Sequence, residues 1–393
     1  MGWSSWLAFL AALPGHAALC NTAVNHLHAL GISRWWIRAG TLVAYTWCAC
    51  MPAGALLYLL ERWPAGWAGG PWLWLVAGYG VLALANSLIY LPWWLVQRMR
   101  AGEPAVLLAN HTTYHPLGRR EHARPSWRDP PSWWLWLGGN EATDLAVQEK
   151  QLHIPGMDAA WDGFTILHVS DIHLTGRICK EWFIKALRLS QQRPVDLAVV
   201  TGDLIDHPAC AAWLPDLLGE LHAPVGVYGV LGNHDVRRRN LAALRAVLPS
   251  TRWIDVAGRC LRIEARGRTL LLAGTARPWI KAEPPLVGPE QPEARGVLRV
   301  LISHSPDQLA WARRHHVHLM LAGHTHGGQI QLPGLGAVVA PSHYGVKYAG
   351  GTFYEPPTVL HVVRGLSSQL PLRLRCPPEI ARLVLRSHPL PPR

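Results

Sequence analysis

The sequence has 393 residues, half of them apolar and only 16% charged, and its formal net charge is +12 at pH 7. This length allows two or three domains, and seven cysteines without a CxxC pair argue against a disulfide framework or a zinc knuckle and favour a reducing compartment. Because the basic residues are scattered arginines, anionic lipids or phosphorylated substrates explain the charge as well as nucleic acid does. A nucleic-acid partner is therefore not expected.

The first quarter of the chain has the composition of a membrane region. Residues 1–100 contain six charged side chains, and 15 of the 21 tryptophans precede residue 137. Two charge-free windows, at about 41–60 and 71–96, each reach the roughly 20 residues needed to cross a hydrocarbon core. Tryptophans cluster at their ends, and neither window has the polar face that a buried hairpin of a soluble domain needs. We therefore predict two transmembrane helices within residues 1–100.

Residues 1–33 also lack Asp, Glu, Lys and Arg, but Pro14 and Gly15 interrupt them, and no basic segment precedes them as in a signal peptide. We expect an interfacial or re-entrant segment here, with a third span as the alternative. Basic residues flank the two clear spans on their outer sides, namely Arg34, Arg38, Arg98 and Arg100. The positive-inside rule then places everything C-terminal to the spans in the cytoplasm. The inner membrane of a bacterium is the location expected once the resemblance described below is added.

The pattern changes after residue 142. Residues 101–142 are rich in Pro, Arg and Trp and predict an irregular, membrane-proximal connector. From residue 143 to 393, apolar strand patterns alternate with helical ones. We expect strands within 143–156, 163–171, 195–203, 225–235, 261–265, 269–275, 298–304 and 319–324, and helices within 180–192, 209–221 and 241–248. This alternation indicates a layered α/β domain.

Polar motifs follow the predicted strands. The segments SDIH, TGD, GNHD, ISH and GHTH contribute Asp171, His173, Asp203, Asn233, His234, Asp235, His304, His324 and His326. Because α/β sheets bind ligands at the carboxyl ends of their strands, we expect these side chains to converge. Imidazole with carboxylate suits Mn, Fe or Zn better than Ca. Seven candidate ligands exceed the needs of one ion and predict two divalent ions, which together can activate a bridging water for phosphoryl transfer.

The order of these motifs resembles that of the calcineurin-like metallophosphoesterase superfamily over roughly residues 161–386. The longer segments GHTHGGQIQLPG, SHSPD and RCPPEIARLVL look most like a bacterial membrane-associated branch, which includes proteins similar to UDP-2,3-diacylglucosamine pyrophosphate hydrolases. The resemblance implies a four-layer αββα sandwich, here preceded by the transmembrane region, and a metal-dependent hydrolase.

The resemblance also implies a role for each motif residue. It places Asp203 between the two metals, and it assigns the remaining ligands as Asp171, His173 and His326 to the first metal and Asn233, His304 and His324 to the second. His234 would stabilise the transition state or protonate the leaving oxygen, and Asp235 would orient it. Outside the motifs, Arg237 and His343 are candidate substrate contacts, whereas we expect Asp206 to be structural.

The substrate expectation depends on the motif spacing and on the membrane region. About 30 residues separate His173 from Asp203, and again Asp203 from Asn233, which leaves no room for a cap domain. The Pro-rich loop at 276–296 is the best candidate for a specificity lid. We expect hydrolysis of a phosphodiester or pyrophosphate bond in a lipid-linked substrate. A phosphodiesterase for soluble nucleotides or nucleic acid is the alternative, and a non-catalytic scaffold is weaker because every motif residue is present.

Overall fold

The computed structural model describes residues 3–60, 72–100, 103–118, 132–280, 282–285 and 296–388. The chain divides into two compact units, Met1–Glu103 and Pro104–Arg393. Residues 119–131 of the expected connector, and residues 281 and 286–295 of the expected lid, lie outside the described residues.

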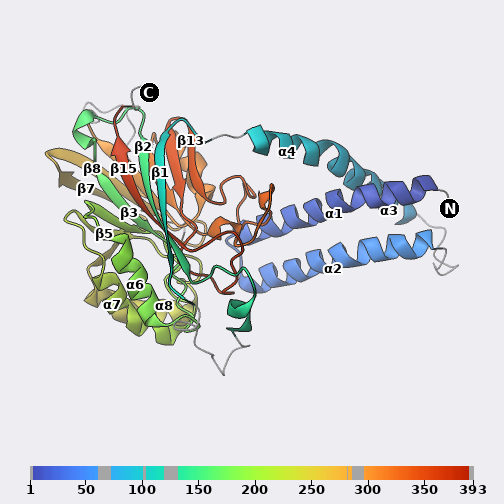
Figure 1. Cartoon of the computed structure of the whole chain (residues 1–393), viewed down its shortest axis with the longest axis horizontal. Coiled ribbons are helices and arrows are strands. Elements are labelled where there is room, and N and C mark those ends of the chain that lie inside the picture. The colour runs from blue at the N-terminus through green and yellow to red at the C-terminus, as the bar shows by residue number, and fades with distance from the viewer. Residues whose placement is uncertain are drawn as a thin grey trace. The chain divides into compact units, whose positions relative to one another are not determined.

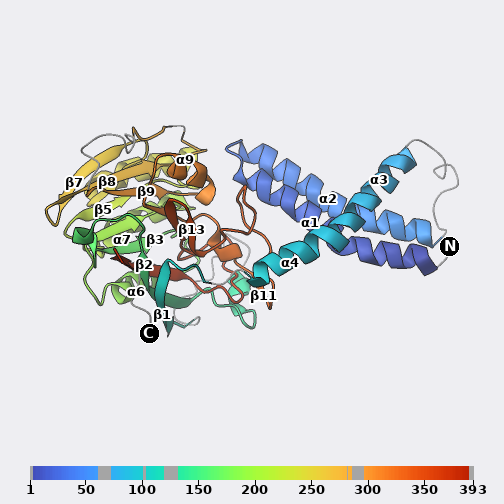
Figure 2. The same cartoon turned by 90° about the horizontal axis from the view of Figure 1, so that it is seen from above.

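The first unit consists of long apolar helices. They are α1 (Trp3–Ala29), α2 (Arg34–Leu59) and a third continuous stretch made of α3 (Trp72–Ala85), the π-helical turn η2 (Asn86–Tyr90) and α4 (Leu91–Arg100). Helix α1 lies beside α2 and also contacts α3 and η2 (Figures 1 and 2). Three stretches in the described residues are long and apolar enough to cross a membrane: Trp3–Ala29, Arg34–Leu59 and Trp74–Met99.

The structure differs from the sequence expectation at the N-terminus. Residues 3–29 form one unbroken helix with Pro14 inside it, long and apolar enough to be a candidate membrane span. Proline is tolerated within membrane helices, because neighbouring helices can supply partners for the freed backbone groups. The next residue, Gly15, is held by the third stretch: its backbone N–H donates to Ser87 Oγ at 2.6 Å, and its carbonyl accepts from Asn86 Nδ2 at 2.9 Å. The helix at residues 3–29 therefore supports the alternative expectation, a third membrane span.

The second unit contains two large mixed sheets. One has the order β1-β2-β15-β3-β4-β5-β6 and the other β13-β14-β10-β9-β8-β7, with a separate ribbon β11-β12. The first sheet comprises β1 (Leu107–Pro116), β2 (Asp144–His153), β15 (Glu379–Arg386), β3 (Thr165–Val169), β4 (Leu197–Val200), β5 (Gly226–Gly229) and β6 (Trp253–Asp255). The second comprises β13 (Gly351–Glu355), β14 (Thr358–Val362), β10 (Leu319–Ala322), β9 (Leu298–Ser303), β8 (Arg268–Thr275) and β7 (Cys260–Ala265), and the ribbon pairs β11 (Gln331–Leu332) with β12 (Gly336–Ala337). Strands β3, β4 and β5 are parallel, as are β8, β9, β10 and β14.

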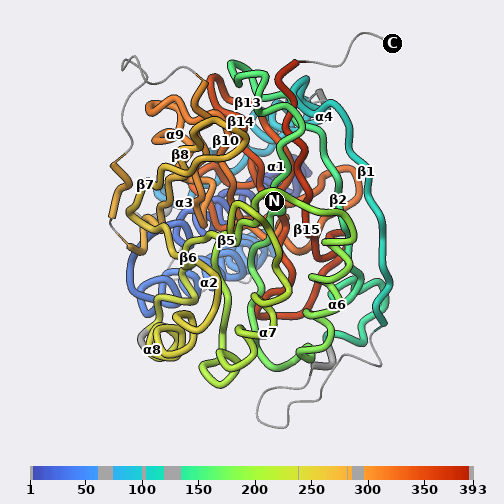
Figure 3. Tube along the Cα trace, turned by 90° about the vertical axis from the view of Figure 1, so that its left-hand side faces the viewer, coloured from blue at the N-terminus to red at the C-terminus, as the bar shows by residue number. Residues whose placement is uncertain are grey.

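The two sheets pack face to face with helices outside. Ile166 and Val199 of the first sheet and Leu272 and Val300 of the second belong to one buried apolar cluster between them. Helices α6 (Lys180–Ser190), α7 (Leu214–Gly219) and α8 (Arg238–Val247) cover the outer face of the first sheet, and α9 (Leu309–Arg314) covers that of the second (Figure 3). The four-layer αββα sandwich is therefore confirmed.

Strand β1 was not expected. Residues 107–116 fall in the predicted irregular connector, yet they form an edge strand that pairs antiparallel with β2. Most of its side chains are exposed or only half buried, so no apolar period marks it in the sequence. The strands and helices expected between residues 143 and 324 are all present. The segment expected as a helix at 209–221 is a 3-10 helix up to Trp213 and an α-helix from Leu214 to Gly219, and the strand expected within 225–235 ends at Gly229.

Candidate metal centre

The motif residues lie at strand ends in an unusual backbone conformation. Asp171 and His173 follow β3, Asp203 follows β4, and His324 and His326 follow β10. All five have positive φ, from 44° at His173 to 72° at His324, and they account for five of the nine such non-glycine residues in the described chain. Side chains disfavour this left-handed region, and non-glycine residues held there cluster at functional sites. The turns are shaped to aim these side chains, at a cost in local stability.

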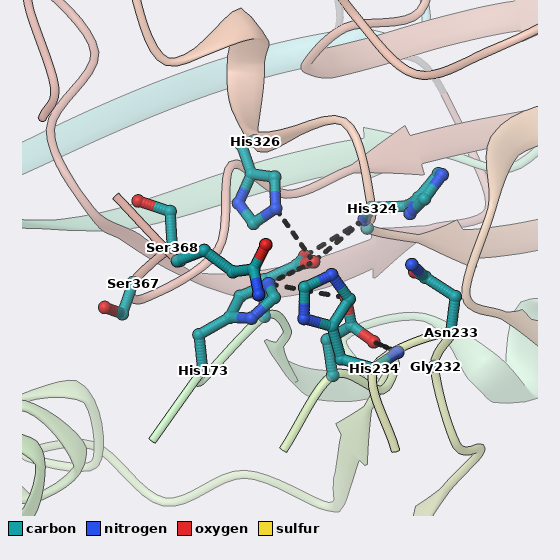
Figure 4. A network of polar contacts seen from close by, with 12 residues as sticks. His173, Gly232, Asn233, His234, His324, His326, Ser367 and Ser368 are labelled. Carbon is teal, nitrogen blue, oxygen red and sulfur yellow. Dashed lines mark hydrogen bonds and ion pairs between the residues drawn. The ribbon is translucent and has the colours of Figure 1, made fainter. Parts of the chain in front are cut away.

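One group of polar atoms gathers around Asp171. The Nε2 atom of His173 lies 3.8 Å from Asp171 Oδ1 and 3.4 Å from Asp203 Oδ2, and His326 Nε2 lies 3.7 Å from Asp171 Oδ1. These separations exceed a good hydrogen bond but match the spacing of ligands around a shared ion. Figure 4 shows the rings of His173 and His326 turned toward each other, with centroids 4.9 Å apart.

A second group gathers on the other side of Asp203. The backbone carbonyl of Thr201 lies 2.6 Å from His304 Nδ1, so this nitrogen carries the proton and donates. The opposite nitrogen, Nε2, faces Asn233 Oδ1 at 3.1 Å and Asp203 Oδ2 at 3.3 Å. His324 Nδ1 lies 3.1 Å from His304 Nε2. Two oxygen acceptors and two ring nitrogens therefore crowd together, an arrangement that a cation stabilises.

A buried ring nitrogen without a partner supports the same conclusion. His173 Nε2 faces Asp171 and Asp203 in the first group, is buried and has no hydrogen-bond partner among the described residues. An unpaired buried polar group is costly, and one that faces two carboxylates indicates a missing ligand. The donor set of imidazoles, carboxylates and one amide oxygen fits a divalent transition metal. The sequence-predicted ligands are thus brought together in the two predicted groups, and they could hold metal ions.

Glycine at position 323 makes the close approach possible. A Cβ atom there would lie 1.9 Å from Ser170 Oγ and 2.5 Å from Asp171 Oδ2. The tight turn also lets the backbone N–H of His324 donate to Asp171 Oδ2 at 3.0 Å. The first glycine of GHTH is therefore required by packing against the metal-site carboxylate.

Asp206, which we expected to be structural, instead holds two histidines of the site. Its Oδ2 accepts from His173 Nδ1 at 2.7 Å, and its Oδ1 is hydrogen-bonded to His234 Nδ1. Burial acts to raise the pKa of Asp206, but the two histidines together lower it far below its usual range. Gln369 Nε2 adds a hydrogen bond to Oδ1 at 3.1 Å, which sequence reasoning had no signal to find. Asp206 is therefore the carboxylate behind His234.

The expectation that Asp235 orients His234 is wrong. The Asp235 carboxylate points into the protein and accepts from the backbone N–H groups of Leu204 at 2.8 Å, Gly232 at 2.9 Å and Ile205 at 3.1 Å. Burial raises the pKa of Asp235 to about 7, and nearby Asp203 adds to the effect. Asp235 therefore ties the GNHD turn to the segment after β4 and does not touch the His234 ring.

The two carboxylates can be told apart by substitution. We expect Asp206→Asn to lower kcat/KM by about 10- to 100-fold, the usual effect of losing a carboxylate behind working histidines. Asp235→Asn should lower the melting temperature, because it weakens acceptance from buried backbone donors, while changing activity less than Asp206→Asn does. Steady-state kinetics and thermal melts of both variants check this. The reverse ranking in activity would contradict the assignment of Asp206.

The two candidate substrate contacts differ in their placement. Arg237 is 18% exposed, and its Nη1 lies 3.1 Å from Asp206 Oδ1. Its Nε and Nη2 are buried and have no partner among the described residues, so the guanidinium offers two donors beside the site. His343 lies on an exposed turn where its backbone N–H donates to Asp307 Oδ1, and its ring is not among the side chains that converge. Arg237 therefore lies beside the converging side chains, and His343 lies on this exposed turn.

Trp279 also lies at the centre, and the sequence did not single it out. It belongs to the described start of the 276–296 loop, after β8. Its ring centroid lies 4.9 Å from that of His324 and 5.3 Å from that of His304, both in edge-on geometry. This part of the loop supplies an apolar wall to the metal-site histidines. The sequence feature that could have indicated Trp279 is its position directly after Arg277 and Pro278 in a long loop.

Comparisons with known proteins agree with this geometry. Residues 164–328 match the profile of the family described as calcineurin-like phosphoesterase. The chain is 33% identical over 241 residues to the metallophosphoesterase YkuE of Bacillus subtilis, covering 58% of this chain and 80% of that protein. It is 29% identical over 228 residues to the phosphodiesterase YaeI of Escherichia coli, covering 56% of this chain and 82% of that protein.

A more distant relative has a lipid-linked substrate in its name. The UDP-2,3-diacylglucosamine pyrophosphatase LpxG of Chlamydia trachomatis is 24% identical over 303 residues, which cover 63% of this chain and 91% of that protein. This similarity is weaker in identity than those to YkuE and YaeI, but it extends over more residues than either.

Proposed function

Because this chain belongs to the calcineurin-like phosphoesterase family and is therefore a metal-dependent phosphoester hydrolase, we propose that it acts on a lipid-linked substrate at a membrane. The proposed reaction is hydrolysis of a phosphodiester or pyrophosphate bond at a centre of two divalent ions. The proposal rests on the presence, in one chain, of a complete pair of ligand groups and three candidate membrane spans.

The two ligand groups define the proposed metal sites. Asp171, His173 and His326 would hold one ion, Asn233, His304 and His324 the other, and Asp203 would bridge them. The mixture of imidazole and carboxylate favours Mn, Fe or Zn. When bound, such a pair supplies Lewis acidity and lowers the pKa of a bound water.

The remaining polar side chains would act on the substrate. The backbone N–H of His234 donates to Asp203 Oδ1 at 2.8 Å, which keeps the residue beside the centre. With its Nδ1 held by Asp206, the ring of His234 would use Nε2 to hydrogen-bond the developing charge or to protonate the leaving oxygen. Arg237 would direct its two free N–H groups to a phosphoryl oxygen, since a guanidinium matches that geometry.

The role of Arg237 can be tested against its neighbour. We expect Arg237→Lys to raise KM for a phosphodiester by about 10- to 100-fold, because a lysine cannot reproduce two fixed charged hydrogen bonds. Arg239→Lys is the matched control, since Arg239 is exposed in the adjoining helix α8. Initial-rate kinetics over a range of substrate concentrations give the measurement. Equal KM values for the two variants would remove Arg237 from the binding site.

The candidate membrane helices support the proposed substrate class. An enzyme anchored by three spans meets amphiphilic substrates at the interface, whereas a soluble nucleotide gives the anchor no chemical role. The similarity to a UDP-2,3-diacylglucosamine pyrophosphatase supports a lipid-linked nucleotide diphosphate as one specific form.

The proposed location is the cytoplasmic face of a bacterial inner membrane. With three spans, Arg34 and Arg38 lie in the first turns of the second span, and Arg98 and Arg100 lie at the C-terminal end of the third. These four arginines then share one side, which the positive-inside rule assigns to the cytoplasm. The chain leaves its last span on that side, so the second unit would work there.

Substrate competition tests the proposal directly. Purified full-length protein, loaded with Mn²⁺, is assayed on a soluble bis-aryl phosphodiester and on a UDP-linked diacyl sugar in detergent micelles, with His234→Ala as the catalytic control. Much faster cleavage of the lipid-linked compound, lost in the variant, supports the proposal. Cleavage of the soluble diester alone favours a soluble-nucleotide phosphodiesterase, and steeply salt-dependent DNA binding with nuclease activity favours nucleic acid.

A further inference from the structure

A separate cluster of potential metal ligands lies in the helical unit. The proposed hydrolysis uses none of its residues. His16 and Cys20 are one turn apart on α1, and Cys48 is on α2. One ligand atom from each lies within 4.8 Å of the other two. His16 and Cys20 are only 5% and 7% exposed, so the group faces the interior of the unit. Polar side chains inside apolar helices are costly and mark functional sites by default.

Helix α2 lacks one backbone hydrogen bond beside this cluster. Pro52 has no N–H, so the carbonyl of Cys48, four residues earlier, lacks its normal helical donor. His16 Nε2 lies 3.1 Å from that carbonyl oxygen and 3.9 Å from Cys20 Sγ. The carbonyl oxygen, the imidazole nitrogen and a sulfur therefore face one another at distances that ligands of one ion adopt.

The orientation of the imidazole is fixed from a third helix. Tyr79 Oη lies 2.5 Å from His16 Nδ1, and the two rings meet edge-on with centroids 5.6 Å apart. When Nδ1–H donates to the tyrosine oxygen, the lone pair of Nε2 faces Cys20 Sγ and the backbone carbonyl of Cys48. Metal-bound histidines are commonly oriented by such a hydrogen bond from the nitrogen that does not bind the metal.

From this geometry we propose that His16, Cys20 and Cys48 form a zinc site that joins α1 to α2, separate from the catalytic centre. Two thiolates and an imidazole are ligands that Zn²⁺ prefers. The Cys48 carbonyl or a water would complete the coordination. Zinc binding would release the two thiol protons, so the site would bind more tightly as pH rises.

The packing of α1 does not depend on the cysteines. Gly15 is held to the third stretch through Ser87 and Asn86. A Cβ at Gly15 would lie 2.0 Å from the Ala83 carbonyl oxygen, which shows how closely the helices approach there. Serine in place of Cys20 or Cys48 should therefore leave the helices assembled.

Cobalt titration of the reduced full-length protein in detergent tests the proposal, with the catalytic centre first loaded with Mn²⁺. A thiolate–Co²⁺ charge-transfer band in the near ultraviolet reports only cysteine ligands, and the catalytic groups contain none. We expect the band to saturate at one equivalent, to be displaced by Zn²⁺, and to be lost in Cys20→Ser and Cys48→Ser. Cys50→Ser is the control, because Cys50 is exposed on the same helix as Cys48, and it should keep the band.

Three results would overturn the zinc site. They are no band in the reduced wild-type protein, a band that survives both Cys20→Ser and Cys48→Ser, and a band lost equally in Cys50→Ser. The first is the result expected if His16 only supplies a donor to the carbonyl freed by Pro52. Circular dichroism of each variant verifies that the helices are retained.

Discussion

Replacing His234 with alanine should lower kcat by about 10²- to 10⁴-fold, the range that general acid–base groups contribute. The physical reason is that the imidazole of His234 lies beside both ligand groups but is proposed to contact the substrate and not the metal ions. Its ring lies edge-on to that of His173 at 4.6 Å, and its Nδ1 is held by Asp206. Loss of the ring removes a donor to the transition state without removing any of the seven proposed ligands.

Metal content decides how that loss is interpreted. We expect His234→Ala to retain as much Mn²⁺ as the wild-type protein, measured by elemental analysis after gel filtration. His222→Gln, an exposed histidine outside the site, should be fully active. If His234→Ala loses metal in proportion to its activity, the residue is a ligand and its proposed catalytic role fails.

Asp203→Asn should be at least as damaging, because Asp203 is the one carboxylate shared by both ligand groups. Its Oδ2 lies 3.4 Å from His173 Nε2 and 3.3 Å from His304 Nε2, and the side chain is buried. An amide has no charge and only one oxygen to bridge with. We expect kcat/KM to fall by about 10³-fold or more, since both ions of the centre are affected.

Thermal melts with and without metal provide a readout that is independent of turnover. A ligand that binds only the folded state stabilises it by about 2.7 kcal/mol at 100 times its Kd. Added Mn²⁺ should therefore raise the melting temperature of the wild-type protein and of Asp216→Asn, an exposed aspartate. Asp203→Asn should show little or no increase. A full increase in Asp203→Asn would show that Asp203 is not needed for binding the ions.

The sequence was a good guide where local pattern determines structure. Buried strands such as 165–169 and 298–303 are short apolar runs followed by polar turns, and both were predicted, whereas the buried strands at 358–362 and 379–386 were not. Because parallel strands place their carboxyl ends at one edge, the convergence of Asp171, His304 and the other motif residues followed from strand order alone. The helical unit was predicted from composition, since lipid selects apolar residues all round a helix.

The prediction errors arose where the direction of a side chain determines its role, or where long-range pairing determines whether a strand forms. Asp206 and Asp235 each lie within a few residues of a predicted ligand, and only the three-dimensional turn shows that Asp206 meets His234 while Asp235 accepts from backbone amides. Strand β1 is an exposed edge stabilised by pairing with β2, and β15 enters the first sheet between β2 and β3 from the far end of the chain. No local pattern encodes such pairings.

In the proposed centre, one chain holds two metal ions bridged by Asp203. Electron paramagnetic resonance of the full-length protein during Mn²⁺ titration tests it most directly. We predict that two ions bind per chain, that the spectrum becomes that of an exchange-coupled pair, and that Asp203→Asn abolishes this coupling. A spectrum of isolated Mn²⁺ at saturation, with one ion per chain, would contradict the two-metal centre.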